Sequence, residues 1–208
     1  MNRRRVNQRR RLAPLLAVLA AGALLLSGCS SDPLADQYRE GSNKGFIAGD
    51  GSVTEIALAD RGDAIEFSGV TETGETVTSA DTQGEVLVVN FWYASCAPCR
   101  AEAADLQRIN AQFENEGASF LGVNVRDQAP NAIAFSETYG VTYPSVLDVD
   151  TGAMQLAFSG SIPPNAVPTT LVLDAEGRVA ARILGQVTSP SILETLIRDT
   201  IAESGTTE

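Results

Sequence analysis

The feature that most constrains this chain is a pair of cysteines, Cys96 and Cys99, placed where a buried strand passes into a helix. The residues before them, from Val86 to Trp92, are almost all apolar, which is typical of a strand covered on both faces of a sheet. The residues after them, from Ala101 to Leu106, are good helix formers without a breaker. Because a helix N-terminus stabilises negative charge, it lowers the pKa of a thiol placed there. The arrangement predicts a redox-active dithiol.

The Cys-x-x-Cys spacing alone would also suit half of a metal site or an inert disulfide. The chain has three cysteines and no histidine, which excludes Ser-His-Asp and Cys-His catalysis and histidine-ligated zinc, copper or haem. If Cys29, which follows an apolar N-terminal segment, carries a lipid, only Cys96 and Cys99 remain, and two cysteines cannot close a zinc site within one chain. We therefore expect no metal and no cofactor other than the Cys96–Cys99 disulfide itself.

The N-terminal segment is typical of an export signal. Residues 1–11 contain six arginines and no acidic residue, and Leu12 to Leu26 form an apolar run that is short for a membrane span. The run ends in Leu-Ser-Gly before Cys29, which looks like a bacterial lipobox. We expect residues 1–28 to be a lipoprotein signal peptide and Cys29 to carry a diacylglyceryl group, so that acyl chains hold the protein on the extracytoplasmic face of the membrane.

Two alternatives to this reading of the N-terminus stay open. One is an ordinary signal peptide with a chance cysteine at position 29. The other concerns the export route, because the arginine pairs also suggest twin-arginine export, although the residues that follow them favour the general route.

The chain beyond the predicted signal peptide is strongly acidic. Six of the 15 basic residues and none of the 26 acidic residues precede Cys29, so the mature chain carries a formal net charge of −17. Such a charge repels nucleic acid and anionic lipid headgroups, and we expect no nucleic-acid partner and a membrane contact through the lipid alone. Residues 29–52 are polar and rich in Gly, Ser and Asp, which predicts a flexible tether before a folded domain at 53–208.

Strands alternate with helices along this predicted domain. The predicted strands are 53–57, 64–70, 76–78, 86–93, 118–125, 145–147, 169–173 and 179–184, and the predicted helices are 96–114, 132–139, 152–158 and 192–202. Turns at Thr71–Gly74 and Asp174–Gly177 predict two hairpins. The order predicts an α/β fold with a central mixed sheet, helices on both faces and an N-terminal β-hairpin extension.

Two motifs resemble the thioredoxin-like fold. The segment from Trp92 to Cys99 resembles its Trp-x-x-x-Cys-x-x-Cys active site, and Val167-Pro168-Thr169-Thr170 looks like its cis-proline loop. The closer likeness is to the membrane-anchored TlpA/ResA-type thiol–disulfide oxidoreductases. It is carried by Val89–Trp92, Glu102, Gly122–Val125 and Tyr143–Asp148, and it extends over about Glu66 to Ile201.

The resemblance implies roles for the residues of the cysteine motif. Cys96, at the helix start, is expected to be the attacking thiol and the one nearer the surface, and Cys99 the resolving thiol. Pro98 suits the first helical turn, where its missing N–H has no partner to lose. Trp92 is expected to pack beside the thiols, which is compatible with a plain core position.

The resemblance also implies a cis peptide bond before Pro168. Such a bond would expose the backbone of Val167 to an extended substrate, which could pair with it as with an edge strand. A trans proline at the start of a strand is the alternative. The preceding loop, Gly160–Ala166, could wall the substrate groove or simply be rigid, and we leave its role open.

Asn90 and Glu102 bear on proton transfer. Thioredoxins carry a buried acid at the position of Asn90, and an asparagine cannot accept a proton in its place. Glu102 lies one turn after Cys99 on the same predicted helix, and the resemblance implicates it in activity, since a carboxylate beside a thiol can accept its proton. The alternative is an acid that favours the helix dipole. Arg100 and Asp127 are expected to be surface residues.

These expectations combine into a lipid-anchored, monomeric thiol–disulfide oxidoreductase. The resemblance implies a reductase of a partner protein's disulfide, with apocytochrome c as one candidate substrate and a CcdA-type membrane thiol transporter as electron donor. A disulfide-forming oxidase is the alternative, because the direction is set by the reduction potential, in which about 30 mV corresponds to about 1.4 kcal/mol, a shift that Ala97, Pro98 and Glu102 could supply. A redox-silent binding lipoprotein is the non-enzyme alternative. A thiol peroxidase lacks its Thr-x-x-Cys pattern here, and a copper chaperone would need a histidine.

Overall fold

The computed structural model describes residues 52–162 and 166–204. The predictions for the signal peptide, for Cys29 and for nearly all of the tether concern residues outside these ranges. Of the helices that the model describes, none combines the length and the apolar character needed to cross a bilayer.

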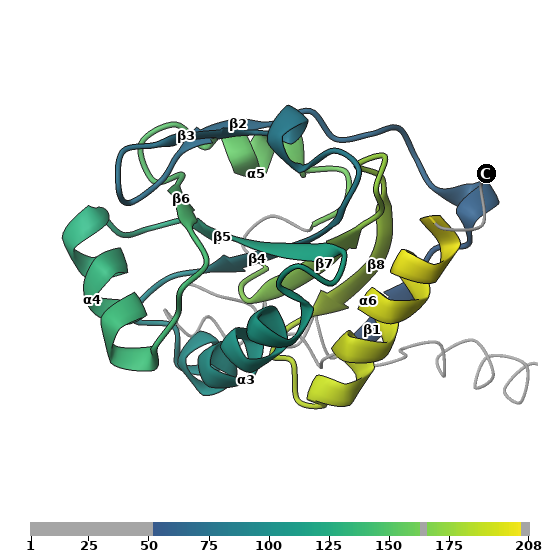
Figure 1. Cartoon of the computed structure of the whole chain (residues 1–208). Helices are drawn as coiled ribbons and strands as arrows, with labels where there is room; N and C mark the ends of the chain where they lie inside the picture. Colours follow the sequence, from purple (N-terminus) through teal and green to yellow (C-terminus); the bar gives the residue numbers. More distant parts are fainter. Residues whose placement is uncertain (1–51, 163–165, 205–208) are drawn as a thin grey trace, which may run out of the picture. The chain divides into compact units, whose positions relative to one another are not determined.

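Strand β4 (Val86–Trp92) lies in the middle of the main sheet, and all seven of its residues are buried. It pairs in parallel with β5 (Ala118–Asn124) and antiparallel with β7 (Thr169–Leu173). β6 (Ser145–Leu147) extends the sheet in parallel beyond β5. The strand order β1-β8-β7-β4-β5-β6 contains both parallel and antiparallel pairs, which confirms the predicted mixed sheet (Figure 1).

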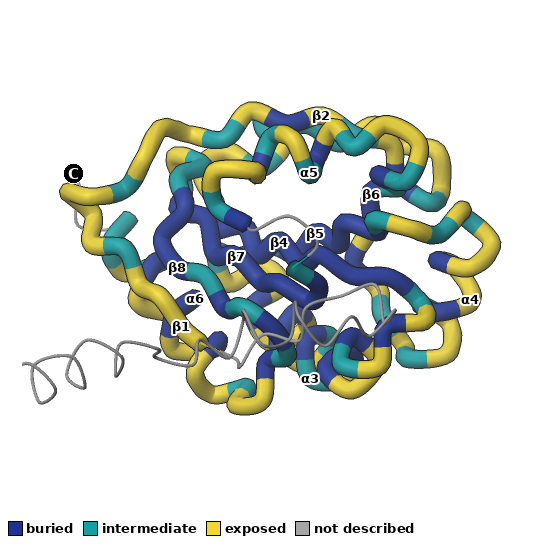
Figure 2. The backbone as a smooth tube through the Cα atoms, turned by 180° about the vertical axis from the view of Figure 1, so that it is seen from behind, coloured by how far each residue is buried: buried dark blue, intermediate teal, exposed yellow. Residues whose placement is uncertain are grey.

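The other side of the sheet is built from β8 (Val179–Leu184) and β1 (Ser52–Glu55), both antiparallel to their neighbours. β8 follows β7 through a turn in which the Asp174 side chain accepts the backbone N–H groups of Glu176 and Arg178. β1 is the edge strand on this side of the sheet, and all four of its residues are exposed, as the yellow trace of Figure 2 shows. Its pairing with β8 could not be read from its own residues, because β8 lies more than 120 positions further along the chain.

The two faces of the sheet are covered by different elements (Figure 1). Val86 and Val88 of β4 pack under α3 (Ala97–Phe113) and α6 (Pro190–Ser204). The alternate residues of β4 pack on the opposite face, under α5 (Ala153–Ala157) and the segment around Phe67. This alternation is what a strand buried on both faces requires, and it confirms helices on both faces.

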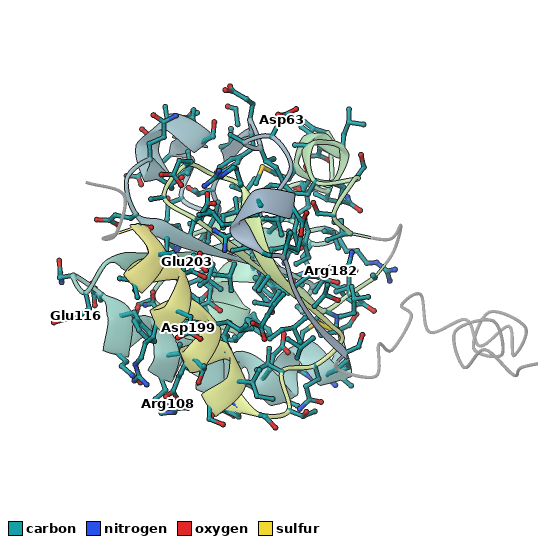
Figure 3. The ribbon with its side chains drawn as sticks, turned by 90° about the vertical axis from the view of Figure 1, so that its right-hand side faces the viewer. Asp63, Arg108, Glu116, Arg182, Asp199 and Glu203 are labelled. Atoms are coloured by element: carbon teal, nitrogen blue, oxygen red, sulfur yellow. A yellow bond between two sulfur atoms is a disulfide. The ribbon has the colours of Figure 1, made fainter. Side chains whose placement is uncertain are left out.

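Helix α4 (Ala129–Tyr139) packs beside α3, where Ala132 and Phe135 join the apolar cluster around the cysteines. It begins three residues earlier than predicted, because Pro130 is accommodated in its first turn, where no donor is lost. Helix α6 begins at Pro190, two residues before the predicted start at residue 192, because a proline is accommodated in the first turn of a helix. An ion pair of 2.9 Å between Arg108 and Glu194 joins α3 to α6 on the surface, and Figure 3 shows this side of the molecule with Arg108 and Asp199 labelled.

The predicted N-terminal hairpin is present but short. β2 (Ser68–Val70) and β3 (Thr76–Thr78) form a separate two-stranded sheet, and single turns of 3₁₀ helix occur at Leu58–Asp60 and Ser79–Thr82. The hairpin lies close on β6, since a Cβ atom at Gly69 would approach Val146 Cγ1 to 2.3 Å. The main sheet and the hairpin together confirm the thioredoxin-like α/β fold.

Candidate active site

Cys96 and Cys99 form a disulfide at the N-terminus of α3, with 5.3 Å between their Cα atoms. Cys96 is the N-cap residue of the helix, and its sulfur accepts the backbone N–H of Cys99 at 3.2 Å. Pro98 stands in the first turn, as predicted. A backbone donor at a helix N-terminus therefore points at the Cys96 sulfur, which would stabilise a thiolate at that position.

Both cysteines are buried in this oxidised form, with exposed fractions of 0% for Cys96 and 2% for Cys99. The prediction that Cys96 lies nearer the surface is therefore wrong for the disulfide state. The reason is packing, because Cys96 and Cys99 belong to one apolar cluster with Trp92, Tyr93 and Val167. The two residues beside Cys96 in the chain, Ser95 and Ala97, are exposed, so the disulfide lies just beneath the surface.

The peptide bond between Val167 and Pro168 is cis, which confirms the expectation from the resemblance. Val167 packs in the same cluster as the cysteines, and the Pro168 carbonyl accepts the backbone N–H of Gly185 at 2.9 Å. The structure thus brings the cis-proline segment and the disulfide together from positions about 70 residues apart. Positions 163–165 of the preceding loop lie outside the described residues.

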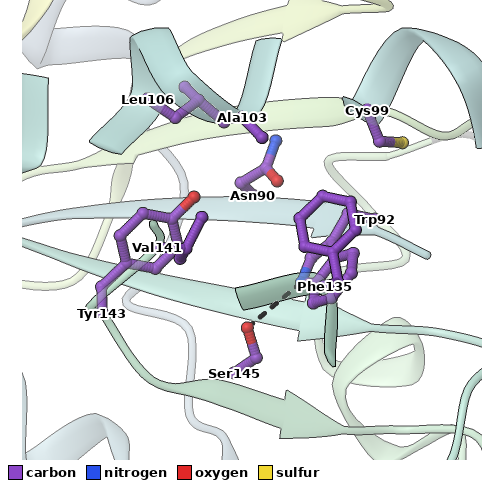
Figure 4. A pocket seen from close by; sticks show the side chains of 9 residues that line it. All are labelled: Asn90, Trp92, Cys99, Ala103, Leu106, Phe135, Val141, Tyr143 and Ser145. Atoms are coloured by element: carbon purple, nitrogen blue, oxygen red, sulfur yellow. Dashed lines mark hydrogen bonds between the residues drawn. The ribbon is translucent and has the colours of Figure 1, made fainter. Parts of the chain in front are cut away.

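Trp92 is buried in the core and packs in one cluster with the two cysteines, so the expected position beside the thiols and the core position are both correct. Its ring stacks on Phe135 with 4.2 Å between centroids, and its indole N–H donates to Ser145 Oγ at 3.2 Å (Figure 4). This bond needs a glycine at position 122, because a Cβ atom there would lie 2.1 Å from Ser145 Oγ and 2.8 Å from Trp92 Nε1.

Glu102 is almost completely buried, with 1% of its surface exposed. Its Oε1 accepts the Asn90 amide N–H at 3.0 Å, and its Oε2 accepts the backbone N–H of Val187 at 2.7 Å. Burial raises the pKa of the Glu102 carboxyl group to about 7, although the hydrogen bonds from Val187 and Asn90 offset part of the effect. Glu102 can therefore bind and release a proton near neutral pH, one helical turn behind Cys99.

Asp127 is a site residue that sequence reasoning placed on the surface. The prediction was wrong: the side chain is half-buried, and its Oδ2 accepts the backbone N–H of Ala94 at 2.6 Å and the Asn124 amide at 3.0 Å. It thereby fixes the loop that leads from β4 to Cys96. Its place in the sequence could have indicated this role. Asp127 follows β5 as the cysteine motif follows β4, and parallel strands end at the same edge of the sheet. Arg100 is exposed, as predicted.

Comparisons with known proteins agree with this geometry. The Redoxin family model matches residues 57–197, more than half of the chain. Thiol-disulfide oxidoreductase ResA of Bacillus subtilis is 28% identical over 136 residues, which cover 65% of this chain and 73% of that protein. Thiol:disulfide interchange protein DsbE of Allochromatium vinosum is 30% identical over 183 residues, 86% of each chain.

A solved structure extends the likeness to three dimensions. A secreted thiol-disulfide isomerase from Corynebacterium glutamicum superposes with a TM-score of 0.66 and 33% identity, over 76% of this chain and 96% of that one. The resemblance inferred from the motifs is thus confirmed. With its Cys-x-x-Cys disulfide at a helix N-terminus beside a cis-proline, the chain belongs to the Redoxin family, among the thioredoxin-fold thiol–disulfide oxidoreductases of the ResA and DsbE type.

Proposed function

We propose that this protein is an extracytoplasmic, lipid-anchored reductase of disulfides in a partner protein. The observation that carries the proposal is the Cys96–Cys99 disulfide at the start of α3 with the buried, titratable Glu102 one turn behind it. A general base with a pKa near the working pH suits a reaction in which a buried thiol must lose its proton.

The proposed reaction is dithiol–disulfide exchange and needs no further cofactor. The Cys96 thiolate attacks one sulfur of the substrate disulfide, a mixed disulfide forms, and one substrate thiolate leaves. Cys99 then gives up its proton and attacks the Cys96 sulfur, so that the Cys96–Cys99 disulfide forms and the second substrate thiolate leaves. The substrate gains the two electrons that the dithiol loses, and the Cys99 proton passes to the Glu102 carboxylate.

The proposed setting is the outer face of the cell membrane, with Cys29 as the lipid attachment point and the protein acting as a monomer. The name of the secreted Corynebacterium relative supports a place outside the cytoplasm, and the lipobox-like sequence before Cys29 supports the anchor. We propose apocytochrome c as one substrate, whose Cys-x-x-Cys must be reduced before haem attachment, and a CcdA-type thiol transporter as the electron donor. The cis Val167–Pro168 segment is the proposed binding edge for the substrate backbone.

Trapping tests both the site and the roles of its cysteines. Cys99→Ser should hold Cys96 in mixed disulfides with natural substrates, which mass spectrometry can identify, whereas Cys96→Ser should trap nothing. The reverse pattern would exchange the two roles. If neither variant traps a partner and the wild type reduces insulin no faster than Cys96→Ser does, the protein is a redox-silent binding lipoprotein.

The direction of electron flow needs a separate measurement. Cells are quenched with acid and their free thiols alkylated, so that the redox state of Cys96 and Cys99 is preserved. A dithiol that is mostly reduced at steady state supports the reductase. One that is mostly oxidised contradicts it and identifies the disulfide-forming oxidase.

A further inference from the structure

A small pocket lies behind the disulfide, on the side of the sheet that α3 covers (Figure 4). Its walls include Cys99, Asn90 and Tyr143 together with apolar side chains such as Leu106 and Phe135. Its volume of about 10 Å³ is close to the least room that one water molecule needs.

Two polar side-chain atoms of buried residues face this pocket. Asn90, which is 3% exposed, uses its amide nitrogen for Glu102 Oε1 at 3.0 Å and Thr170 Oγ1 at 3.1 Å. Its carbonyl oxygen is left on the pocket side. Tyr143, which is 8% exposed, points its hydroxyl across the pocket towards Asn90 (Figure 4).

Neither the Asn90 carbonyl nor the Tyr143 hydroxyl has a hydrogen-bond partner among residues 52–162 and 166–204. Neither atom is among the fully enclosed side-chain atoms that lack a partner, since Arg182 Nε is the only such atom in the described ranges. Each oxygen therefore keeps surface that a water molecule in the pocket can reach, and polar groups in this position are usually satisfied by an ordered water. A donor from tyrosine and an acceptor from asparagine match the two kinds of hydrogen bond that a single water makes.

We propose that Tyr143 is a positioning residue of the thiol reaction: its hydroxyl and the Asn90 carbonyl hold one water molecule against Cys99, and this water donates a hydrogen bond to the Cys99 sulfur as the thiol loses its proton to Glu102. The inference rests on the proposed function and deepens it, because it names the group that stabilises the Cys99 thiolate. Both oxygens of Glu102 already accept hydrogen bonds, and Glu102 is not part of the pocket wall. The water in the pocket therefore contacts the thiol and not the base.

Few titratable groups lie near the pocket. They are Glu102 of α3, which lies behind Asn90, and the Cys96–Cys99 pair at the start of that helix. Within the described ranges, the pocket walls from β4, α4 and β6 contribute no charged side chain. Burial, and next the charge of Glu102, raise the pKa of the Tyr143 hydroxyl. Tyr143 thus stays protonated in the physiological range and serves as a hydrogen-bond donor to the water.

Tyr143→Phe removes the hydroxyl and keeps the ring, which packs against Phe120 at 5.6 Å between centroids. Reduced protein is mixed with 5,5′-dithiobis(2-nitrobenzoate) in a stopped-flow instrument. The attack by Cys96 releases one thionitrobenzoate, and the attack by Cys99 on the mixed disulfide releases the second. We expect the second phase to be about tenfold slower in Tyr143→Phe, with a shifted pH profile, and the first phase to be unchanged.

The matched control is Tyr139→Phe. Tyr139 stacks on Phe135 with 4.6 Å between centroids, but it does not line the pocket, so both phases should remain as in the wild type. A wild-type second phase in Tyr143→Phe, or an equal slowing in both variants, overturns the inference. A crystal structure of the wild type with no water between Tyr143 and Asn90 also overturns it. If the wild type itself releases no thionitrobenzoate, the proposed function fails first, and this outcome is distinct from the others.

Discussion

The Glu102 carboxyl group loses its water shell on folding, and two hydrogen bonds replace only part of that solvation. Its pKa rises from 4.5 to about 7 in the folded protein. Between these values the unfolded chain has lost the Glu102 proton while the folded protein keeps it, so the free energy of unfolding falls as the pH rises. Above about pH 7 both states are ionised and the curve flattens. The full effect is about 3 kcal/mol at most.

Glu102→Gln should abolish this pH dependence, since an amide does not titrate. The variant should also be less stable at pH 5 by about 1–3 kcal/mol, because the glutamine NH₂ group must face another donor, either Asn90 or the Val187 N–H. Urea unfolding of the oxidised protein between pH 5 and pH 8 measures both effects. Glu137→Gln, on the exposed side of α4, should keep the wild-type slope. A slope that persists in Glu102→Gln contradicts the assignment of the titration to this residue.

Some residues of the site could be placed from local sequence patterns, and others could not. The proximity of Glu102 to Cys99 follows from helix spacing, and the cis bond at Pro168 follows from the motif around it. The burial of Cys96, the bond from Ala94 to Asp127 and the pocket side of Tyr143 depend on contacts between segments that lie far apart in the chain. No local pattern encodes such contacts, so these three features came from the structure alone.

At the scale of elements, three neighbouring strands meet behind the disulfide at one level of the sheet. Asn90 of β4 pairs with Gly122 of β5, and Gly122 pairs with Ser145 of β6. The Trp92 indole reaches across Gly122 to Ser145 Oγ. The absence of a side chain at position 122 is therefore what allows the Trp92 indole to donate its hydrogen bond to Ser145 while it packs in one cluster with the cysteines.

Gly122→Ala should reduce the free energy of unfolding by about 2–4 kcal/mol, because the new methyl group would collide with Ser145 Oγ and break the bond from Trp92. Chemical denaturation measures the loss. The fluorescence of Trp92, the only tryptophan of the chain, should report the displaced ring in the native state. Gly62→Ala is the control, since a Cβ atom at position 62 meets nothing within 4 Å. Equal stability of the two variants would contradict this account of the glycine.

The sequence predicts which residues form helices and strands better than it predicts which strands pair. The apolar run of β4, the turn at Asp174 and the helical residues of α6 are each local signals, and these elements formed within two residues of their predicted bounds. The edge position of β1 against β8 has no such cause, because four exposed residues specify no partner. The short β2–β3 hairpin is likewise defined by its contact with Val146 of β6 more than by its own residues.

At the scale of the whole described domain, Arg61 connects three segments that lie far apart in the chain. Its side chain is 3% exposed and pairs with Asp174 at 3.0 Å, in the turn between β7 and β8, and with Glu203 near the end of α6. Its Nε–H donates to the Ile56 carbonyl, just after β1. One guanidinium thus binds the edge strand, a hairpin turn and the last helix.

Arg61→Met should destabilise the protein by about 3 kcal/mol, because it removes a partner of the buried Asp174 carboxylate and leaves the Ile56 carbonyl without its donor. Asp174 keeps its 2.8 Å pair with Arg178, which limits the loss. Arg108→Met is the matched control: it breaks the surface pair with Glu194, where Arg108 is 51% exposed, and solvent-screened pairs of this kind contribute little. Denaturation in urea compares the two, and hydrogen exchange should show β1 and the end of α6 opening first in Arg61→Met. Equal losses in the two variants would mean that Arg61 is a surface charge like Arg108, with no part in holding the edge strand to the rest of the domain.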